Sequence, residues 1–290
     1  MNTQVTEIAM TRDIRAYLIA EAVNAAIKAG AEIMKIYKNA DDYDISVKSD
    51  RTPITVADRL AHDKIKEALG TTRIPILSEE GREMLYDERR NWEMFWLVDP
   101  LDGTVEFIKG NNEFTVNIAL MQDNVCIGAV VYVPYYRKMY IGERGHGAHF
   151  VPDMAPSADA GYSYDDIVSA WKPLPFGSGP HPHPRVAVSR SHQTAETAEF
   201  IEKIRRRYPD VEIVEQGSSY KFCMLAEGVV DYYVRTSATY EWDTAAGELI
   251  LAEAGGRTVS LDDGSEFRYN KEDLHNPWFE CRSCNCRIEL

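Results

Sequence analysis

The chain has 290 residues, and no apolar run in it approaches the ~20 residues needed to cross a bilayer. Its first residues also lack a basic region followed by an apolar stretch and a small-residue cleavage site. We therefore expect neither an integral membrane segment nor a secretion signal.

Basic residues are in deficit. Lysine and arginine together number 32 against 46 aspartates and glutamates, which gives a formal net charge of −14. Nucleic acid polymers and anionic membranes are themselves negative, so an acidic chain binds them poorly. The sequence also lacks clustered basic and aromatic residues, and a nucleic-acid-binding module is disfavoured. A small anionic substrate remains compatible, provided that a metal or a local basic pocket offsets the repulsion.

Cysteine is scarce, with five residues in the chain. Cys126 and Cys223 lie inside apolar segments, as buried thiols do. The group Cys281–Cys286 could hold a soft metal with His275, but free thiols on a mobile tail are the favoured interpretation. A reducing cytoplasm fits this usage best, so we expect a cytoplasmic protein. Whether it is a monomer or a homodimer is left open by the sequence.

Hydrophobic residues make up 44% of the chain, which is ample for a packed core. In the first half, helices are predicted over residues 12–38 and from Thr55, as the cap, to Leu69, with a polar turn or hairpin at residues 47–53 between them. Strands are predicted over residues 95–98, 115–121, 127–133 and 138–143, the last three in antiparallel succession.

Residues 152–184 are rich in Pro, Gly, Ser and Asp and predict a long surface loop that crosses between two halves. After this loop, strands and helices alternate. Strands are predicted at 185–189, 211–215, 231–234 and 258–261, and helices at 194–207, 218–227 and 243–254. The alternation indicates an α/β second half behind an antiparallel first half.

The stretch Asp99–Thr104 contains two carboxylates, a glycine and a hydroxyl that could together bind a metal and a phosphate. Pro100 cannot extend a central strand, so the chain is expected to turn after Val98, with Asp99 and Asp102 on either side of the turn. Gly103 allows the backbone to approach a ligand closely. Oxygen-only ligands suit Mg²⁺, and amides at a helix start favour phosphate oxygens. An acidic turn without a ligand is the alternative interpretation.

Two further acidic positions lie at strand-to-helix junctions, where ligand sites of α/β proteins form. Glu79 and Glu80 follow the short apolar strand 76–77, and Asp243 begins a helix whose residues 245–247 are small. The alternatives are a solvated loop acid for Glu79 and a helix N-cap for Asp243.

Taken together, these motifs resemble those of the magnesium-dependent, lithium-sensitive inositol monophosphatase superfamily. The superfamily pattern has a Glu-Glu pair, D-P-[IL]-D-G-T, W-D-x-A-A-G and E-A-G-G. This chain carries the four elements in that order at Glu79-Glu80, Asp99–Thr104, Trp242–Gly247 and Glu253–Gly256. The resemblance runs from Lys48 to about Trp278.

Within the superfamily the chain resembles the CysQ-type 3′(2′),5′-bisphosphate nucleotidases. The stretches that carry this resemblance are residues 102–109, 112–120, 188–192 and 217–223. Inositol monophosphatases usually have Asn where Glu106 stands. Val105 departs from the Lys that CysQ-type proteins commonly have, and substrate affinity could differ as a result.

The resemblance implies an α+β fold, a layered αβαβα sandwich of the sugar-phosphatase type. It implies an N-terminal α+β subdomain over residues 1–155, which carries Asp58, Glu79 and the Asp99–Thr104 motif. The C-terminal α/β subdomain, residues 156–290, carries Asp243 and substrate-binding residues. The two would form one phosphatase unit.

The implied activity is Mg²⁺-dependent hydrolysis of the 3′-phosphate of adenosine 3′,5′-bisphosphate, or of its sulfated form, in sulfur assimilation or nucleotide recycling. An inositol or sugar phosphate phosphatase of the same superfamily is the alternative. A metal- or nucleotide-binding protein without turnover is the non-enzymatic alternative, which ranks low because no implied ligand is missing. Phosphoryl transfer needs positioning more than covalent chemistry, in keeping with the absence of a persuasive Ser-His-Asp or Cys-His set.

The resemblance also implies a role for each matching residue. Two or three Mg²⁺ ions would be held by Glu79, Asp99, the Leu101 carbonyl, Asp102 and Asp243. The attacking water would be activated by Asp58 and Thr104, with Glu79 as a further catalytic residue. Substrate would be bound by Glu79, Gly103, Thr104, Arg190, His192, Ser218, Lys221, Arg235 and Asp243. Of these, the cationic and hydroxyl side chains of the second half are expected to bind the phosphate that is not cleaved.

Overall fold

The computed structural model describes residues 11–39, 46–47, 53–177 and 179–289. The predicted first helix is confirmed as α1, Arg12–Tyr37, which begins where the Thr11 hydroxyl accepts the Ile14 amide at 3.3 Å. The second is α2, Val56–Leu69, which begins at Thr55 in a capping box with Asp58. Both helices bury their apolar faces against one side of a large sheet. No described helix is long and apolar enough to cross a membrane.

This first sheet has seven strands in the order β3-β4-β5-β6-β7-β8-β9. Strand β3 pairs parallel with β4, and every later neighbour pairs antiparallel. The strands are β3 Ile76–Ser78, β4 Met94–Asp102, β5 Thr115–Gln122, β6 Val125–Val133, β7 Lys138–Glu143, β8 Gly147–Val151 and β9 Lys172–Pro173. The antiparallel succession expected in the first half is confirmed for β5, β6 and β7, while the parallel strand β3 makes the sheet mixed.

The second sheet is mixed and has the strand order β11-β10-β12-β14-β13. The three predicted strands β10, β11 and β12 are parallel, whereas β14 pairs antiparallel with β12 and β13. The strands are β10 Arg185–Ser189, β11 Glu212–Gln216, β12 Tyr232–Arg235, β13 Arg257–Ser260 and β14 Phe279–Arg282.

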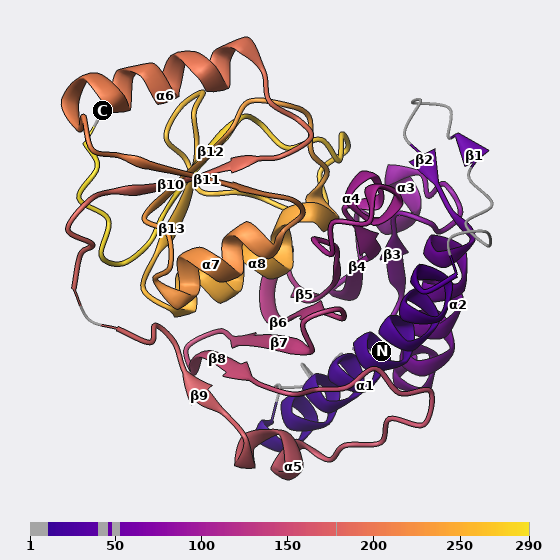
Figure 1. Cartoon of the computed structure of the whole chain (residues 1–290). Coiled ribbons are helices and arrows are strands. Elements are labelled where there is room, and N and C mark those ends of the chain that lie inside the picture. Colours follow the sequence, from indigo (N-terminus) through magenta and orange to yellow (C-terminus); the bar gives the residue numbers. More distant parts are fainter. Residues whose placement is uncertain (1–10, 40–45, 48–52, 178, 290) are drawn as a thin grey trace, which may run out of the picture.

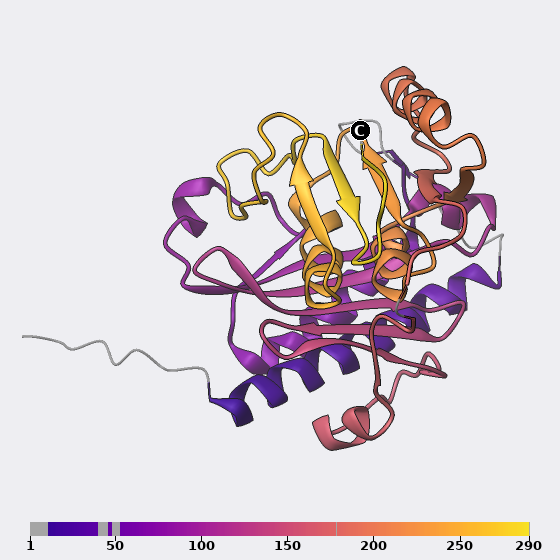
Figure 2. The same cartoon turned by 90° about the vertical axis from the view of Figure 1, so that its left-hand side faces the viewer.

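Two helices, α7 (Tyr220–Glu227) and α8 (Glu241–Glu253), lie between the sheets, and their buried side chains join both sheets in one core. Helix α6, Ala195–Arg207, covers the outer face of the second sheet. Figures 1 and 2 thus show five layers: α1 and α2, the first sheet, α7 and α8, the second sheet, and α6. This arrangement confirms the predicted αβαβα sandwich.

Tight packing between the middle helices depends on the small residues predicted at 245–247. A Cβ atom added to Gly247 of α8 would lie 2.7 Å from Cγ of Phe222 on α7. Because a real Cβ does not approach a ring so closely, only glycine allows the two helices this spacing. The position of α7 and α8 in turn sets where Asp243 stands.

Strand β4 corrects the prediction that the chain turns after Val98. The strand continues through Pro100 to Asp102, with a register shift between Asp99 and Asp102 before pairing resumes opposite Thr115. A bulge of this kind tolerates a proline, which has no amide to donate to the ladder. The bulge brings both carboxylates to the end of the strand.

Two predictions about irregular segments were also wrong in part. The segment 152–184 contains a helix, α5 (Tyr164–Ser169), and strand β9, which extends the first sheet. The C-terminal cysteines do not lie on a mobile tail, because Cys281 is buried in β14 between two neighbouring strands. Among the described residues, no set of cysteine and histidine is arranged to bind a metal.

The remaining elements are short. Strands β1 (Ser46–Val47) and β2 (Pro53–Ile54) pair antiparallel, as the predicted hairpin requires, although its residues 48–52 lie outside the described part of the chain. Helix α3 spans Tyr86–Arg89, and α4 spans Thr104–Lys109. Helix α4 begins directly after the bulge of β4 and places Thr104 at its first position.

Candidate active site

A cavity lies where the two halves of the chain meet. Its walls come from the ends of β3, β4 and β12, from the starts of α4, α7 and α8, and from the loop after β10. Most of the predicted site residues line it: Glu79, Asp99, Leu101, Asp102, Gly103, Thr104, His192, Ser218, Lys221, Arg235 and Asp243. Asp58 lies behind Thr104, and Arg190 is not among the lining residues.

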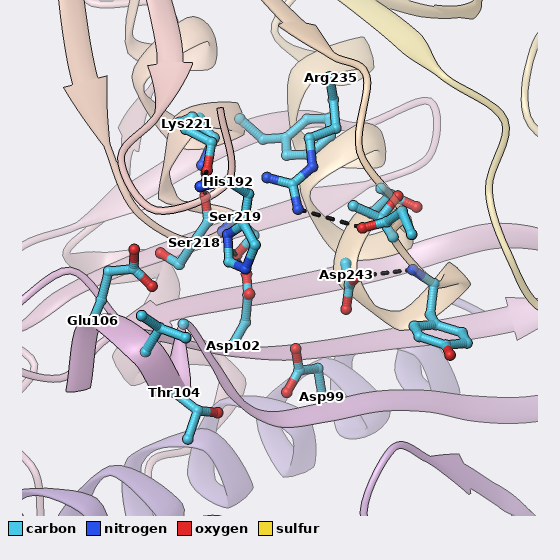
Figure 3. Close-up of a pocket in the computed structure, with 18 of the residues that line it drawn as sticks. Asp99, Asp102, Thr104, Glu106, His192, Ser218, Ser219, Lys221, Arg235 and Asp243 are labelled. Atoms are coloured by element: carbon cyan, nitrogen blue, oxygen red, sulfur yellow. Dashed lines mark hydrogen bonds between the residues drawn. The ribbon is translucent and has the colours of Figure 1, made fainter. Parts of the chain in front are cut away.

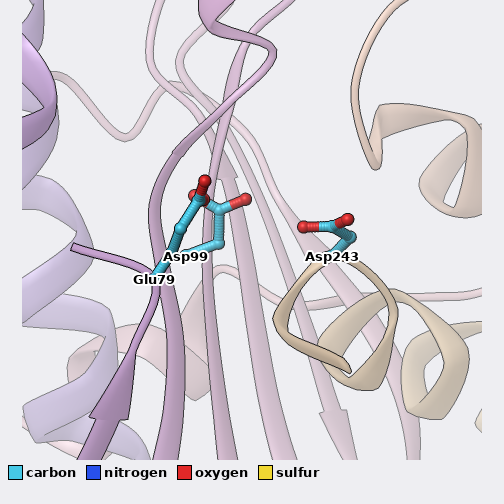
Figure 4. Close-up of side chains that lie close together, drawn as sticks. All are labelled: Glu79, Asp99 and Asp243. Atoms are coloured by element: carbon cyan, nitrogen blue, oxygen red, sulfur yellow. The ribbon is translucent and has the colours of Figure 1, made fainter. Parts of the chain in front are cut away.

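Three carboxylates converge at one side of the cavity. Glu79, Asp99 and Asp243 each offer an oxygen, and these oxygens all lie within 4.8 Å of one another (Figure 4). Asp99 is 1% exposed, and burial raises its pKa, with the negative charges of Glu79 and Asp102 adding to the shift. Burial likewise raises the pKa of Asp243, and the charges of Asp102 and Glu79 add to the shift.

Local structure explains these positions. Glu79 follows β3, and its amide donates to the Val98 carbonyl at 3.1 Å. One oxygen of Asp243 accepts the Tyr240 amide at 2.8 Å, so Asp243 does take part in the capping box of α8. Capping leaves its second carboxylate oxygen for another partner. The two alternatives considered for Asp243, cap or ligand, are thus compatible.

Asp102 lies beside this cluster, but hydrogen bonds turn one of its carboxylate oxygens toward Ser219 and Thr115. Its Oδ2 accepts the amide of Ser219 and, at 3.4 Å, the hydroxyl of Thr115. Its charge still reaches the cluster, because it raises the pKa of both Asp99 and Asp243. The predicted ligand therefore also links β4 to the start of α7.

The residues expected to activate water are in direct contact. Thr104 donates its hydroxyl hydrogen to Oδ1 of Asp58 at 2.9 Å, and the Leu101 carbonyl lies 3.3 Å from the same hydroxyl. The other oxygen of Asp58 accepts the amide and hydroxyl of Thr55 at 2.8 and 2.6 Å. Burial raises the pKa of Asp58, while the bonds from Thr55 lower it. The carboxylate is thereby fixed in orientation behind Thr104.

The carboxylate cluster fits a hard divalent cation. Three acids that are buried or half-buried repel one another, and a cation among them would offset both the repulsion and the loss of hydration. All the converging donors are oxygens, as Mg²⁺ requires, and no thiol or imidazole competes among the described members of the cluster. The Leu101 carbonyl is a further oxygen at the cavity wall.

The opposite side of the cavity is cationic (Figure 3). Lys221 is 2% exposed and donates to the carbonyls of Gln216 and Ser218. Burial, followed by the charge of Arg235, lowers its pKa to about 8. Burial also lowers the pKa of His192 to about 4, with Arg235 and Lys221 contributing. At neutral pH this side therefore holds two cations and a neutral imidazole.

Arg235 has an unused donor in this region. Its Nη2 contacts the Ala238 carbonyl at 3.4 Å, whereas its buried Nε has no hydrogen-bond partner among the residues that the structure describes. A buried donor without a partner costs free energy, so a ligand oxygen there would be stabilising. This observation supports an anion subsite on the cationic side.

Arg190 takes a different place from the one predicted. Its Nε and Nη2 donate to the two oxygens of Glu113, both at 2.8 Å, and it also contacts the Glu215 carbonyl at 2.8 Å. Its hydrogen bonds go to protein acceptors, and it is not among the residues that line the cavity.

Two acidic residues and one serine of this region were missed as site residues. In the sequence, Glu106 served only to distinguish the chain from inositol monophosphatases, which usually have Asn there. In the structure it is buried and lines the cavity. Glu113 and Ser219 join the two halves, since Ser219 bonds Asp102, Thr115 and Asn117. The local signals for them were weak, because their partners are more than 70 positions away.

Comparison with known proteins gives consistent matches over almost the whole chain. The model of the inositol monophosphatase family matches residues 15–279. A 3′(2′),5′-bisphosphate nucleotidase CysQ from Buchnera aphidicola is 38% identical over 248 residues, 83% of each chain. The enzyme of the same name from Escherichia coli (strain K12) is 36% identical over 265 residues, 90% of this chain and 98% of its own.

The solved structures agree with these matches. The crystal structure of CysQ from Bacteroides thetaiotaomicron, described as a bacterial member of the inositol monophosphatase family, superposes with a TM-score of 0.83 at 39% identity. The superposition covers 95% of this chain and 99% of that one. The five-layer arrangement is therefore shared with a structure of substantial sequence identity.

Proposed function

Because the chain belongs to the inositol monophosphatase family, we propose that it is a metal-dependent 3′(2′),5′-bisphosphate nucleotidase that removes the 3′-phosphate of adenosine 3′,5′-bisphosphate. The observation that carries the proposal is the division of one cavity into a carboxylate side and a cationic side. A substrate with two phosphates has one anionic group for each side. The products would be AMP and phosphate, and the sulfated form of the nucleotide is a second candidate substrate.

The proposed cofactor is Mg²⁺, two or three ions per site. Glu79, Asp99, Asp102, Asp243 and the Leu101 carbonyl would hold these ions. When bound, they would neutralise charge on the phosphoryl group and favour ionisation of the attacking water. The donor set supports this proposal through its exclusively oxygen chemistry and its mutual repulsion.

The chain's own residues account for orientation of the water. The Thr104 hydroxyl gives its hydrogen to Asp58, so its oxygen is left to accept a hydrogen from a water on the cavity side. Asp58, held by the amide and hydroxyl of Thr55, would receive the proton that Thr104 passes on. Gly103, at φ 90°, lines the cavity directly before α4, where the first amides of that helix would be available to a phosphate oxygen.

On the cationic side, Ser218, Lys221, His192 and Arg235 would bind the phosphate that is not cleaved. Support comes from the buried ammonium of Lys221 and the unpartnered Nε of Arg235. Lys221 donates to two carbonyl oxygens, and the charges of Asp102, Glu106 and Glu113 raise its pKa, but burial and Arg235 outweigh them. A phosphate on this side would therefore further stabilise the charged form of Lys221.

The alternatives are less well supported. An inositol or sugar phosphate with one phosphate would leave the cationic side without a partner. A metal- or nucleotide-binding protein without turnover would not need the Thr104–Asp58 contact. A role in sulfur assimilation or nucleotide recycling, and a cytoplasmic location, remain predictions that follow from the proposed substrate and the cysteine usage.

We also propose that the N-terminal and C-terminal halves are subdomains of one phosphatase unit. The boundary predicted at residues 155 and 156 precedes α5 and β9, which pack with the first sheet. A boundary after β9 therefore suits the layers better. Both proposed subdomains supply residues to the cavity.

A phosphate-release assay with Mg²⁺ tests the proposed function. It should compare adenosine 3′,5′-bisphosphate, its sulfated form, inositol 1-phosphate and fructose 1,6-bisphosphate. Preference for the nucleotides is the expected result. Preference for inositol 1-phosphate would overturn the substrate assignment, and the absence of turnover on all four would favour the binding protein.

A further inference from the structure

The segment from Gly217 to Ser219 joins β11 to α7, and its residues Ser218 and Ser219 line the cavity. Ser218 has φ 52°, in the left-handed region that residues with a side chain rarely adopt. Such a conformation costs about 1 kcal/mol or more and persists only where neighbouring contacts impose it. The contacts that impose it here come from both halves of the chain.

Glu113 supplies the first of these contacts. It belongs to the N-terminal half and is 8% exposed. Its Oε2 accepts the amide of Gly217 at 2.7 Å, and its two oxygens also accept Nε and Nη2 of Arg190 at 2.8 Å. The carboxylate therefore accepts three hydrogen bonds, one from an amide and two from a bidentate guanidinium. Bidentate pairs of this kind fix direction as well as distance.

Arg190 extends the arrangement to the neighbouring strand. Besides Glu113, it donates to the carbonyl of Glu215 at 2.8 Å and to Oε2 of Glu215 at 3.2 Å. It thus links the end of β10, the end of β11 and the loop before β5. Its Nε, Nη1 and Nη2 each donate to protein atoms, and Arg190 is not among the residues that line the cavity.

Close packing adds to these hydrogen bonds. A Cβ on Gly217 would lie 2.4 Å from Cγ of Glu106 and 3.1 Å from Cβ of Glu113. The backbone of Gly217 is therefore pressed between two buried acidic side chains, and a movement of Glu113 would shift it.

The other end of the segment leads to the cationic side of the cavity. The amide of Ser219 donates to Asp102, and Nζ of Lys221 donates to the carbonyls of Gln216 and Ser218. The position of the Lys221 ammonium is thus defined by the same backbone that Glu113 holds.

We propose that the ion pair of Glu113 and Arg190 is a positioning clamp that fixes Ser218 and Lys221 for the phosphate that is not cleaved. The proposal rests on the proposed function for the identity of that phosphate. It replaces the predicted role of Arg190, because a guanidinium occupied by Glu113 and Glu215 acts on substrate through the segment and without touching it.

Two conservative variants test the clamp. Glu113→Gln keeps the shape but loses the charge, and Arg190→Lys keeps the charge but loses the bidentate contact. Each should raise KM for adenosine 3′,5′-bisphosphate about tenfold with little change in kcat. For adenosine 3′-monophosphate, KM should change less than about twofold, because that substrate has no second phosphate.

A matched control is available on the same two strands. Arg185 at the start of β10 pairs with Glu212 of β11 at 2.9 Å, at the end of the strands far from the cavity. Arg185→Lys should leave both KM values unchanged, so an effect confined to the Arg190 and Glu113 variants supports the clamp.

The outcomes separate the roles that Arg190 could have. If Arg190 touched the phosphate, Glu113→Gln would free its guanidinium, and KM for the bisphosphate would stay equal or fall. If the pair only stabilised the fold, kcat and KM would change together on both substrates, and the melting temperature would fall. Either result overturns the clamp.

Hydrogen exchange provides a reading that does not depend on turnover. The Gly217 amide is bonded to Glu113, so exchange in the peptide 216–221 should be at least severalfold faster in both variants and unchanged in Arg185→Lys. Unchanged exchange overturns the clamp. If the unmodified enzyme shows no preference for the bisphosphate, the proposed substrate fails, and the exchange data still decide the clamp.

Discussion

Thr104 and Asp58 are 46 positions apart in the chain, yet the Thr104 hydroxyl lies 2.9 Å from Oδ1 of Asp58. Helix α2 brings Asp58 to this point, and the bulge of β4 brings Thr104. The proposal that these two residues activate water rests on this contact between the start of α2 and the start of α4.

If the two residues form one relay, their variants will not be additive. Thr104→Ala and Asp58→Asn should each lower kcat strongly, and the double variant should be little worse than either single one. Asp58 also caps α2 through Thr55, so Asp58→Asn should cost about 1 kcal/mol of stability. Steady-state kinetics and thermal melting give the two quantities. Independent, multiplicative losses in kcat would show that the residues act separately.

Magnesium binding should be visible without turnover. Ions that bind only the folded state raise its stability, so saturating Mg²⁺ should raise the melting temperature by about 5 °C. Asp99→Asn removes one of the converging charges and should abolish most of that increase. The exposed Asp165→Asn on α5 should retain it. An equal increase in the unmodified protein and in Asp99→Asn would exclude this cluster as the metal site.

Lys221 should give the enzyme a specific dependence on pH. Its pKa is lowered to about 8 by burial and by Arg235, so the amine is charged below pH 8 and neutral above it. In the proposed function, the charged form of Lys221 binds the second phosphate. Therefore kcat/KM for adenosine 3′,5′-bisphosphate should fall as the pH rises above about 8, and Lys221→Gln should lack that fall.

A substrate with one phosphate is the control for the pH dependence. Adenosine 3′-monophosphate should show no loss of kcat/KM at the same pH. At pH 7, Lys221→Ala should raise KM for the bisphosphate by about ten- to a hundredfold and leave the monophosphate nearly unchanged. Equal losses on both substrates would place Lys221 near the scissile phosphate.

Stability should depend on Gly247 where α8 meets α7. A Cβ there would meet Phe222 at 2.7 Å, and overpacking of this kind costs about 1–3 kcal/mol. Gly247→Ala should lower the free energy of unfolding by that amount in chemical denaturation. Gly70→Ala is the control, because a Cβ added to Gly70 would have no atom of another described residue within 4 Å and φ is −57°. This variant should leave the free energy of unfolding unchanged or raise it slightly. A neutral Gly247→Ala would contradict the packing account.

The sequence predicted the fold to the level of its layers and the members of the acidic cluster. The elements and the acidic positions follow from short-range signals, since periodic apolar residues define the elements and the acids stand directly after short strands or at a helix start. The arrangement of the layers was instead implied by the resemblance to the inositol monophosphatase superfamily. Strand β14 was missed because its four residues carry little pattern of their own. It exists through pairing with β12 and β13, to which the sequence gives no local clue.

The orientations of individual side chains were harder to predict from the sequence. Asp102 turns part of its carboxylate toward Ser219, which is 117 positions away, and Arg190 is engaged by Glu113, 77 positions away. Which partner such a side chain takes is decided by how the two halves meet. Pro100 was expected to end its strand, whereas the register shift of β4 accommodates it. Local rules for proline do not anticipate a bulge that tertiary packing imposes.

The most direct test of the central claim is the ratio of kcat/KM for adenosine 3′,5′-bisphosphate to that for inositol 1-phosphate, measured with the unmodified protein at pH 7 in saturating Mg²⁺. Because the proposed function gives a second phosphate charge-assisted contacts on the cationic side, the ratio should exceed about tenfold in favour of the nucleotide. A ratio at or below one would contradict the assignment of Lys221 and Arg235 to a second phosphate and would favour an inositol phosphate phosphatase.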